Sequence, residues 1–429
     1  MEILMVLLAF NFIIIIHELG HFVVAKLSRI KVEEFSLFVG PKIFSFKKGE
    51  TTYSLRTFPI LAYVKMEGED EKSDSERAFY KKPVWIRASV IAAGPLANLV
   101  SAFILIAIFY GVVGYGTTNV GDVVEGSPAH QVGIRKGDKV IGYDYKRVYQ
   151  PMEVFQFLYV SKGKPTEIEI LRNGEKIETQ INPQKVSEAE RYMIGFEPVD
   201  QGENSNVVKN LSPNYPGKEA GLEPGDRIVK LNDTEVSSFE EIKAFLDQNK
   251  DKPISVTVER QGTRKILNMT PKKEVTPEQY KIGLQFTGEK GNLLQVINNA
   301  ALFTYSNSRM VPFTLAWLIT GKVSITQMVG PVGIVDTMSD VVQESPTFMD
   351  KLLNILQLTA YISAAIGATN LIPFPALDGS KLLLLGVEAV RRKPIPIEKE
   401  AIIMTIGFFI LIGFSIFVMS NDILRVFSQ

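Results

Sequence analysis

The sequence of 429 residues contains no cysteine and only three histidines. A chain without cysteine has no disulfides and no thiol nucleophile, and it would have to bind any zinc ion through His, Asp or Glu. Lys plus Arg and Asp plus Glu each total 47, so the chain has no excess of positive charge that would favour a nucleic acid. We therefore expect no nucleic-acid partner.

The N-terminus also lacks the basic region of a secretory signal, and its apolar run shows no convincing small-residue cleavage site. We expect this run to remain in the protein as structure. With 46% hydrophobic and 22% charged residues, the composition fits neither a disordered chain nor one embedded throughout in a membrane. It predicts a membrane part combined with soluble modules.

Four apolar stretches are long enough to cross about 30 Å of hydrocarbon. Three of them contain no charged residue, and the first in the chain is interrupted by Asn11 and by a His-Glu-His group. The four stretches are residues 3–25, 88–114, 352–377 and 401–420.

Basic residues flank two connections between these stretches and predict which side of the membrane each connection faces. Lys26, Arg29 and Lys31 follow the first stretch, and residues 391–393 precede the fourth. Both connections are expected to be cytoplasmic, because short cytoplasmic loops are enriched in Lys and Arg. The chain is then a multi-pass protein of the plasma membrane, with both termini and the long middle segment outside the cytoplasm.

Two further segments are expected to lie near the membrane. Alternating apolar and polar residues between Lys31 and Met66, interrupted by Gly40-Pro41, predict a β-hairpin sheet. In residues 291–350, the apolar run Met310 to Ile319 is too short to span. It predicts an interfacial or re-entrant helix.

The middle segment contains an internal repeat at a constant offset of 88 residues. Residues 127–148 read SPAHQVGIRKGDKVIGYDYKRV, and residues 215–236 read YPGKEAGLEPGDRIVKLNDTEV. The repeat resembles PDZ domains, and the resemblance covers residues 118–288 as two tandem modules. It implies that each module could bind an extended peptide or chain end at a sheet edge. The alternative is that the modules only pack and exclude other proteins.

The first apolar stretch carries His17-Glu18-Leu19-Gly20-His21, which matches H-E-x-x-H. Residues four apart share a helix face at about 6 Å, so the two imidazoles could bind one cation. Zinc bound there would acidify a water, and Glu18 could take its proton and pass it to a leaving amine. The alternative is an incidental polar cluster, but a Glu in a transmembrane helix costs on the order of 2 to 3 kcal/mol, which a structural role seldom offsets.

A third protein ligand is required, and Asp378 is the better of two candidates. The remaining histidine, His130, falls in the repeat on the opposite side of the membrane, where a surface position is the simplest interpretation. Asp378 follows Pro373 and Pro375, which interrupt the third apolar stretch. An Asp at the end of a span also commonly serves as an interfacial anchor or cap.

The expected depth of the two histidines in the membrane favours Asp378 as the third ligand. His17 and His21 lie roughly 7 to 13 Å inside the cytoplasmic boundary by helix rise, and the third stretch ends at that boundary. The second stretch brings Asn98 to a similar depth, and Gly94 permits a close helix approach. Polar groups from three stretches therefore gather in one layer.

Together, these motifs resemble the site-2 protease family. The motifs are H-E-L-G-H in the first stretch, G-P-L-A-N at 94–98 in the second, and N-L-I-P-F-P-A-L-D-G at 370–379 in the third. With the inserted PDZ-like modules, the chain is similar to the bacterial branch that regulates sigma factors, over nearly its whole length. One departure is Pro59-Ile60-Leu61-Ala62-Tyr63, where related sequences commonly carry a Gly pair.

The resemblance implies zinc ligands His17, His21 and Asp378, with Glu18 as the catalytic base. It also implies that Asn370 hydrogen-bonds the unwound substrate and that Asn98 lies near the same site. The substrates would be transmembrane proteins such as anti-sigma factors, or remnant signal peptides. The PDZ-like modules would select substrates that have already been trimmed.

The predicted fold class is a polytopic α-helical membrane protein with about four transmembrane helices, a membrane-associated β-hairpin sheet and two inserted α+β PDZ-like domains. The membrane part is expected to comprise a first transmembrane helix (1–28), the hairpin sheet and loop (29–87), a second transmembrane helix (88–117), an interfacial or re-entrant segment (289–350), a third transmembrane helix (351–390), and a fourth helix with the C-terminal tail (391–429). The first PDZ-like domain (118–200) and the second (201–288) are expected between the second transmembrane helix and the interfacial segment.

Two other functional classes fit part of the sequence. One is a membrane scaffold or receptor whose zinc site is structural, but such a site is normally closed by four protein ligands, whereas this chain offers three and an acid. The other is a metal transporter, which would be expected to need polar groups along a whole pathway rather than at one depth.

Overall fold

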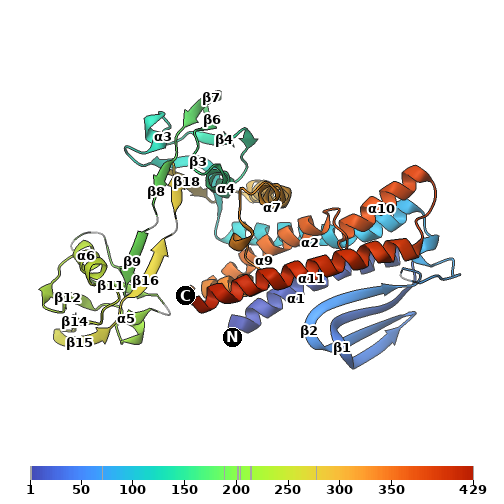
Figure 1. The fold of residues 1–429 in the computed structure, drawn as a ribbon, viewed down its shortest axis with the longest axis horizontal. Coiled ribbons are helices and arrows are strands. Elements are labelled where there is room, and N and C mark those ends of the chain that lie inside the picture. The colour runs from blue at the N-terminus through green and yellow to red at the C-terminus, as the bar shows by residue number, and fades with distance from the viewer. Residues whose placement is uncertain are drawn as a thin grey trace.

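The computed structural model of the chain describes residues 2–69, 71–187, 189–200, 202, 204–212, 215–276 and 278–428. Four helices in this part of the chain are long and apolar enough to cross a membrane. They run alongside one another as an elongated bundle (Figure 1). This confirms the four predicted spans, which are helices α1 (Glu2–Leu27), α2 (Val84–Val112), α9 (Phe348–Asn370) and α11 (Ile397–Ser428).

Glycines let three of these helices approach closely. A Cβ atom on Gly20 of α1 would lie 2.3 Å from the carbonyl oxygen of Ala93 in α2. A Cβ on Gly367 of α9 would lie 2.8 Å from the carbonyl oxygen of Pro95 in α2. No larger side chain fits at either contact, so α2 packs directly between α1 and α9.

The third span ends earlier than predicted. Helix α9 stops at Asn370, and a separate helix, α10 (Asp378–Arg391), begins at Asp378. The expectation of one helix over 351–390 is therefore wrong. Pro373 and Pro375 end α9 because proline lacks the N–H that a helix interior needs, and Ala376 adopts a left-handed φ of 77° in the turn before α10.

The predicted β-hairpin sheet is present as strands β1 (Val32–Lys48) and β2 (Thr51–Met66). Both strands bend, so that residues 34–37 pair with 62–65 on one side and with 52–55 on the other. Residues 42–48 pair with 51–56. The result is four strand segments, and residues 61–66 form one edge of the sheet.

The repeated segment folds into two sheet-rich modules (Figure 1). The first module, defined here as residues 115–181 and 284–289, has the strand order β18-β3-β4-β6-β7 with β5 beside β4. Its elements are β3 (Tyr115–Val123), α3 (Pro128–Gln131), β4 (Lys139–Tyr143), β5 (Lys146–Arg147), α4 (Pro151–Ser161), β6 (Thr166–Arg172), β7 (Glu175–Ile181) and β18 (Leu284–Glu289).

The second module, defined here as residues 196–269, has a four-stranded sheet of order β13-β12-β14-β15 and a separate β10-β11 pair. Its elements are β10 (Phe196–Pro198), β11 (Val208–Leu211), α5 (Pro216–Glu219), β12 (Arg227–Leu231), β13 (Thr234–Glu235), α6 (Phe239–Asn249), β14 (Ile254–Arg260) and β15 (Thr263–Met269).

The second module is inserted into the first. Strand β18 follows the second module in sequence but pairs with β3 of the first, whereas β10 precedes residue 200 but pairs with β11 of the second. Two antiparallel pairs connect the modules: β8 (Gln184–Val186) with β17 (Gln279–Lys281), and β9 (Ala189–Met193) with β16 (Lys272–Thr276). The sheets therefore do not divide at residues 200 and 201, where a tandem arrangement was expected.

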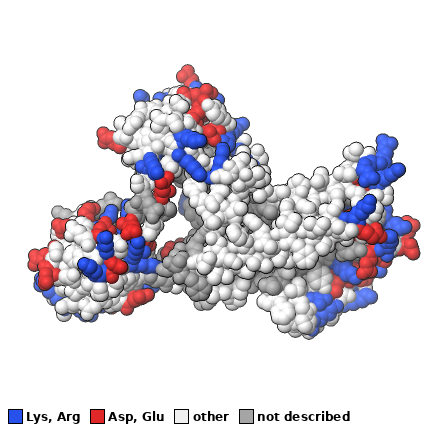
Figure 2. Space-filling model, viewed as in Figure 1, with Lys and Arg blue, Asp and Glu red and all other residues white. Residues whose placement is uncertain are grey.

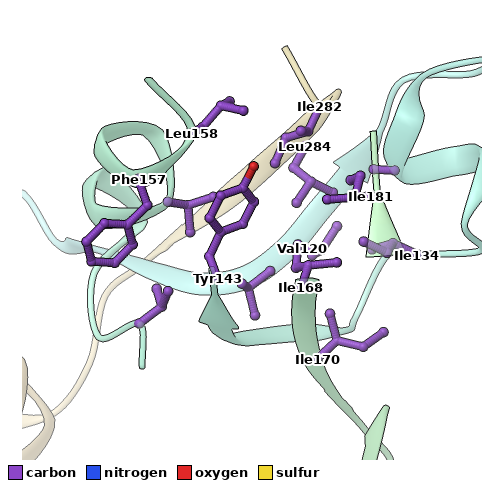
Figure 3. Packing of buried hydrophobic residues seen from close by; sticks show 14 of the residues in the cluster. Val120, Ile134, Tyr143, Phe157, Leu158, Ile168, Ile170, Ile181, Ile282 and Leu284 are labelled. Atoms are coloured by element: carbon purple, nitrogen blue, oxygen red, sulfur yellow. The ribbon is translucent and has the colours of Figure 1, made fainter. Parts of the chain in front are cut away.

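The core of the first module extends to a helix outside it. Val120, Tyr143, Phe157 and Ile168 pack together in this core (Figure 3). Met310 and Trp317 of helix α7 (Leu293–Ile319) belong to the same buried cluster.

Helix α7 also packs against the membrane bundle. Its earlier residues Val296, Ala300 and Phe303 share a buried cluster with Ile106 of α2 and Ala360 of α9. Its 27 residues are more than the predicted short run, and α7 is not among the membrane-length apolar helices of the described chain. It lies across the bundle, nearly end-on in Figure 1, which fits an interfacial helix. Helix α8 (Pro331–Glu344) follows.

Both modules repeat one buried ion pair at the offset of 88 residues. Arg172 Nε lies 2.7 Å from Asp138 Oδ1, and Arg260 Nε lies 2.6 Å from Asp226 Oδ1. Burial raises the pKa of Asp226, but the hydrogen bonds from Arg260 outweigh this effect and hold the pKa below its usual value. The ion pair therefore stabilises the module most when Asp226 is ionised.

We predict that Asp226→Asn destabilises the second module by about 2 to 3 kcal/mol at neutral pH, because Arg260 would lose its charged partner. A lowered pKa contributes stability above the unfolded value of about 3.9 and loses it as the pH falls through the folded value. The deficit of the variant should therefore shrink below about pH 4. Hydrogen exchange of the β12 and β14 amides measures this loss of stability at each pH.

Asp233→Asn is the matched control, because the Asp233 side chain is fully exposed in its 3.6 Å pair with Lys230. It should leave the exchange unchanged. Equal protection of β12 and β14 in both variants would contradict the role given to Asp226.

Candidate metal centre

Two imidazoles face one another on α1. His17 and His21 are four residues apart, and their Nε2 atoms lie 3.2 Å apart. His21 Nδ1 lies 2.8 Å from the carbonyl oxygen of Val90 in α2. Since a carbonyl oxygen only accepts, Nδ1 carries the proton and Nε2 presents a lone pair toward His17.

Gly94 makes room for the His21 ring. A Cβ atom at Gly94 would lie 2.3 Å from His21 Nε2, so any larger residue would displace the ring. The close approach of α1 and α2 at Gly20 brings this position of α2 against the histidine. The G-P-L-A-N motif therefore contributes to the site through its glycine.

Asp378 completes the group as the first residue of α10. Its Oδ2 atom lies 3.1 Å from His17 Nε2 and 3.5 Å from His21 Nε2. The N-terminus of a helix favours a carboxylate, because its free N–H groups carry partial positive charge. Residues from α1 and α10, nearly 360 positions apart in sequence, therefore meet at one point.

The three donor atoms fit a zinc ion. They form a triangle with edges of 3.1, 3.2 and 3.5 Å, and ligands at 2.0 to 2.1 Å in a tetrahedral zinc site are about 3.3 Å apart. Asp378 Oδ2 is buried and makes no hydrogen bond within the described chain. A buried carboxylate oxygen facing two ring nitrogens is the arrangement that a cation stabilises.

A second contact fixes α10 to α2. Arg87 of α2 and Glu388 of α10 form a buried bidentate ion pair, with side chains 5% and 10% exposed. Leu385 of α10 packs in the same cluster as Val90. Helix α2 therefore fixes the positions of both His21 and the helix that carries Asp378.

The group opens into a cavity of about 240 Å³. Glu18 lines this cavity with the three candidate ligands. The cavity is also bordered by the edge segment of the hairpin sheet through Tyr63, Val64 and Met66. The site thus combines a metal-sized triangle, an acid and a strand edge.

The other predicted residues lie apart from the cavity lining. Asn370 is the last residue of α9, is partly exposed, and its side chain makes no hydrogen bond with other described residues. Asn98 is fully buried between α2 and α9, and neither of its amide atoms has a partner within the described chain. A role of Asn98 in substrate binding stays a prediction. His130 lies in α3 of the first module, away from the metal group, as expected.

Sequence reasoning did not identify two charged residues of the cavity. Glu69 follows β2, and Lys381 Nζ lies 2.8 Å from Glu69 Oε1. Lys381 stands three residues after Asp378, so helical spacing from a candidate ligand would have found it. At the departure from the family pattern, Leu61 adopts a left-handed φ of 64°, a backbone conformation that glycine adopts without strain.

The match to known proteins covers nearly the whole chain. A sequence profile of Peptidase family M50 matches residues 5–414. Zinc metalloprotease RasP of Bacillus licheniformis is 30% identical, covering 98% of this chain and 98% of the relative. Regulator of sigma-W protease RasP of Bacillus subtilis (strain 168) and zinc metalloprotease RasP of Oceanobacillus iheyensis are each 29% identical, with the same coverage.

A solved HtrA3 PDZ domain with a phage-derived ligand aligns with 21% of this chain and 92% of its own, at 19% identity. Its TM-score of 0.18 is too low to establish a shared fold. The family match, in contrast, includes three of the four membrane-length helices of the described chain almost completely and the first part of the fourth, to residue 414. The chain belongs to peptidase family M50, the site-2 proteases, and is an intramembrane zinc metalloprotease.

Proposed function

We propose that His17, His21 and Asp378 are the zinc ligands and that Glu18 is the general base of peptide hydrolysis. The triangle of donor atoms supports this proposal most directly, because its edges match those of a tetrahedral zinc site. Three protein ligands leave a position open, which is typical of catalytic rather than structural zinc. Zinc bound here would supply Lewis acidity that polarises the scissile carbonyl and acidifies water.

Glu18 then transfers the proton. Its side chain lines the same cavity as the three ligands, one residue after His17. It accepts a proton from the attacking water and delivers it to the leaving amine, so that the peptide bond breaks into a carboxylate and an amine. Val90 supports this chemistry by holding the neutral tautomer of His21.

The substrate must unwind before this chemistry, because a transmembrane helix uses its peptide groups in its own hydrogen bonds. The edge segment 61–66 borders the cavity on one side and pairs with 34–37 on the other. We assign it the role of pairing with an extended substrate segment. Asn370 follows as a further hydrogen-bonding partner of the unwound backbone, since its amide is partly exposed and unpaired within the described chain.

The substrate class is inferred from the position of the metal group in the membrane and from the name of one relative. The basic residues at 26–31 and 391–393 favour a cytoplasmic location for the end of the bundle near the metal group. The modules then face the extracytoplasmic side. The B. subtilis relative is named a regulator of sigma-W, which favours membrane-bound anti-sigma factors as substrates of this chain, with remnant signal peptides as a second class.

The second module supports a role in binding chain ends. A cavity of about 100 Å³ lies between α6 and the segment before β10, and is lined by apolar Ile194, Phe196 and Ile242 with Arg191 and Lys243. An apolar pocket beside cations suits an apolar last residue and its carboxylate.

The first module carries an aromatic side chain instead of a cation at the equivalent position. Phe155 stands where the second module has Lys243, 88 residues later, and its ring contacts Phe286 at 5.8 Å. The second module is therefore the better peptide binder of the pair. Both modules would exclude substrates with bulky outer domains by size.

We predict that Glu18→Gln lowers the cleavage rate by about 10² to 10⁴-fold while zinc remains bound, because the ligands are unchanged and only the base is lost. Purified protein, a transmembrane peptide substrate and zinc analysis measure both effects. Glu76→Gln, a change at an exposed residue outside the cavity lining, serves as the control with normal activity. A fully active Glu18→Gln enzyme would refute the assignment of the base.

Gly94→Ala should weaken zinc binding, because its methyl group would overlap the His21 ring at 2.3 Å. Gly111→Ala is the matched control on the same helix, since nothing lies within 4 Å of its Cβ position. Competition with a zinc chelator provides the measurement, and we expect at least about a tenfold loss of affinity for Gly94→Ala alone. Equal affinities in the two variants would show that His21 does not need this space.

Removing the modules tests their role as a filter. Tyr115 and Glu289 are paired neighbours, so residues 116–288 can be replaced by a short linker without separating their ends. If the modules exclude bulky substrates, the shortened enzyme should cleave an untrimmed substrate as fast as a trimmed one. The full chain should cleave only the trimmed form. Unchanged discrimination after the deletion would exclude this role.

A further inference from the structure

A cavity of about 330 Å³ lies between the first module and the end of helix α7, apart from the metal centre. Three lysines line it: Lys162 and Lys164 from the connection after α4, and Lys322 just after α7. All three are exposed, and none forms an ion pair with the described residues. The carboxylate in the lining, Asp144, is paired with Lys146. The cavity therefore carries an uncompensated positive charge.

Exposed apolar side chains lie next to these lysines along the chain. Ile319, three residues before Lys322, is 86% exposed, and Ile325 and Val329 are 44% and 45% exposed. Lys and Arg side chains also gather where the first module borders the apolar bundle (Figure 2). Apolar side chains beside cations at one level are typical of a segment lying at a membrane surface.

We infer that this cavity binds the phosphate group of an anionic phospholipid in the leaflet on the side of the modules. Lysine ammonium groups bind phosphate as point charges, and the exposed apolar residues would contact the acyl chains. A free phosphate offers the same charge but no acyl chain, so it would leave Ile319 exposed. The inference uses the membrane placement proposed above and is independent of the zinc chemistry.

A purely structural role for the lysines makes a different prediction. Lys162 caps the end of α4, and Lys322 follows the end of α7, where cations offset the partial negative charge of a helix C-terminus. Such a role would not distinguish one lipid headgroup from another. Headgroup selectivity at this site is therefore the property to measure.

A lipid bound here would attach the first module to the membrane surface. The module is already joined to the bundle through Arg309 of α7, whose Nη2 atom lies 2.6 Å from Glu153 Oε1 of α4. A phosphate held by Lys162, Lys164 and Lys322 would add a contact on the same side of the module. The first module would then keep a fixed position above the bundle while the second extends from it on paired strands.

The two tryptophans of the chain allow a direct test. Trp317 lies on α7 one turn before Lys322, whereas Trp85 lies at the start of α2. In a Trp85→Phe background, Trp317 is the sole reporter. The protein is reconstituted in phosphatidylcholine vesicles that contain either brominated phosphatidylglycerol or brominated phosphatidylcholine at equal mole fraction, and quenching of Trp317 is compared.

We expect phosphatidylglycerol to bind about fivefold or more tightly than phosphatidylcholine. A fivefold gain in affinity corresponds to the attraction of one lysine to an anionic surface. Changing all three cavity lysines to Gln should abolish the preference. Changing three exposed lysines outside the cavity lining (Lys136, Lys139 and Lys281) should retain it. Excess inorganic phosphate, at an ionic strength matched with chloride, should not remove it.

Equal quenching by the two lipids would overturn the proposal. So would a preference that survives the triple change at the cavity, or one that the control triple also loses. Displacement by inorganic phosphate would replace the lipid with a free anion as the ligand. None of these results would alter zinc binding or peptide cleavage, so the proposed function is tested separately.

Discussion

The structure depends on one arrangement of charges inside an apolar bundle, in which a carboxylate and two imidazoles meet with donor atoms 3.1 to 3.5 Å apart. Such a group is unfavourable when the carboxylate oxygen is buried without a hydrogen bond. A dication removes this cost, because it interacts favourably with all three atoms at once. The chemistry of the protein and the local stability of its membrane part are therefore coupled through the same three side chains.

Helix α2 is the element against which this arrangement is built. It accepts a hydrogen bond from the His21 ring at Val90 and leaves space for the ring at Gly94. Through Arg87 it also holds Glu388 of α10, the helix that begins with Asp378. Motifs on three different helices thus act as one unit because each is positioned against the same neighbour.

The membrane spans and the candidate zinc ligands could be predicted from the sequence. The four spans follow from uninterrupted apolar length, and the ligand candidates follow from helical spacing and from depth in the membrane. Pro373 and Pro375 indicated a break in the third stretch, but the end of α9 was placed too late, because the apolar run continues to residue 377 beyond the helix end at Asn370. The insertion of the second module was also missed, since a repeat defines similar units but not the partner of strand β18. The burial of Asn98 where α2 meets α9 could not be predicted, because the sequence alone does not give the direction of its side chain.

X-ray absorption spectroscopy of the zinc-loaded, detergent-solubilised protein tests the central claim most directly. The account predicts a four-coordinate zinc with two imidazole nitrogens and a carboxylate oxygen among its ligands, and the loss of one imidazole contribution in a His17→Ala variant. A spectrum with other ligands, or one that His17→Ala leaves unchanged, would contradict it.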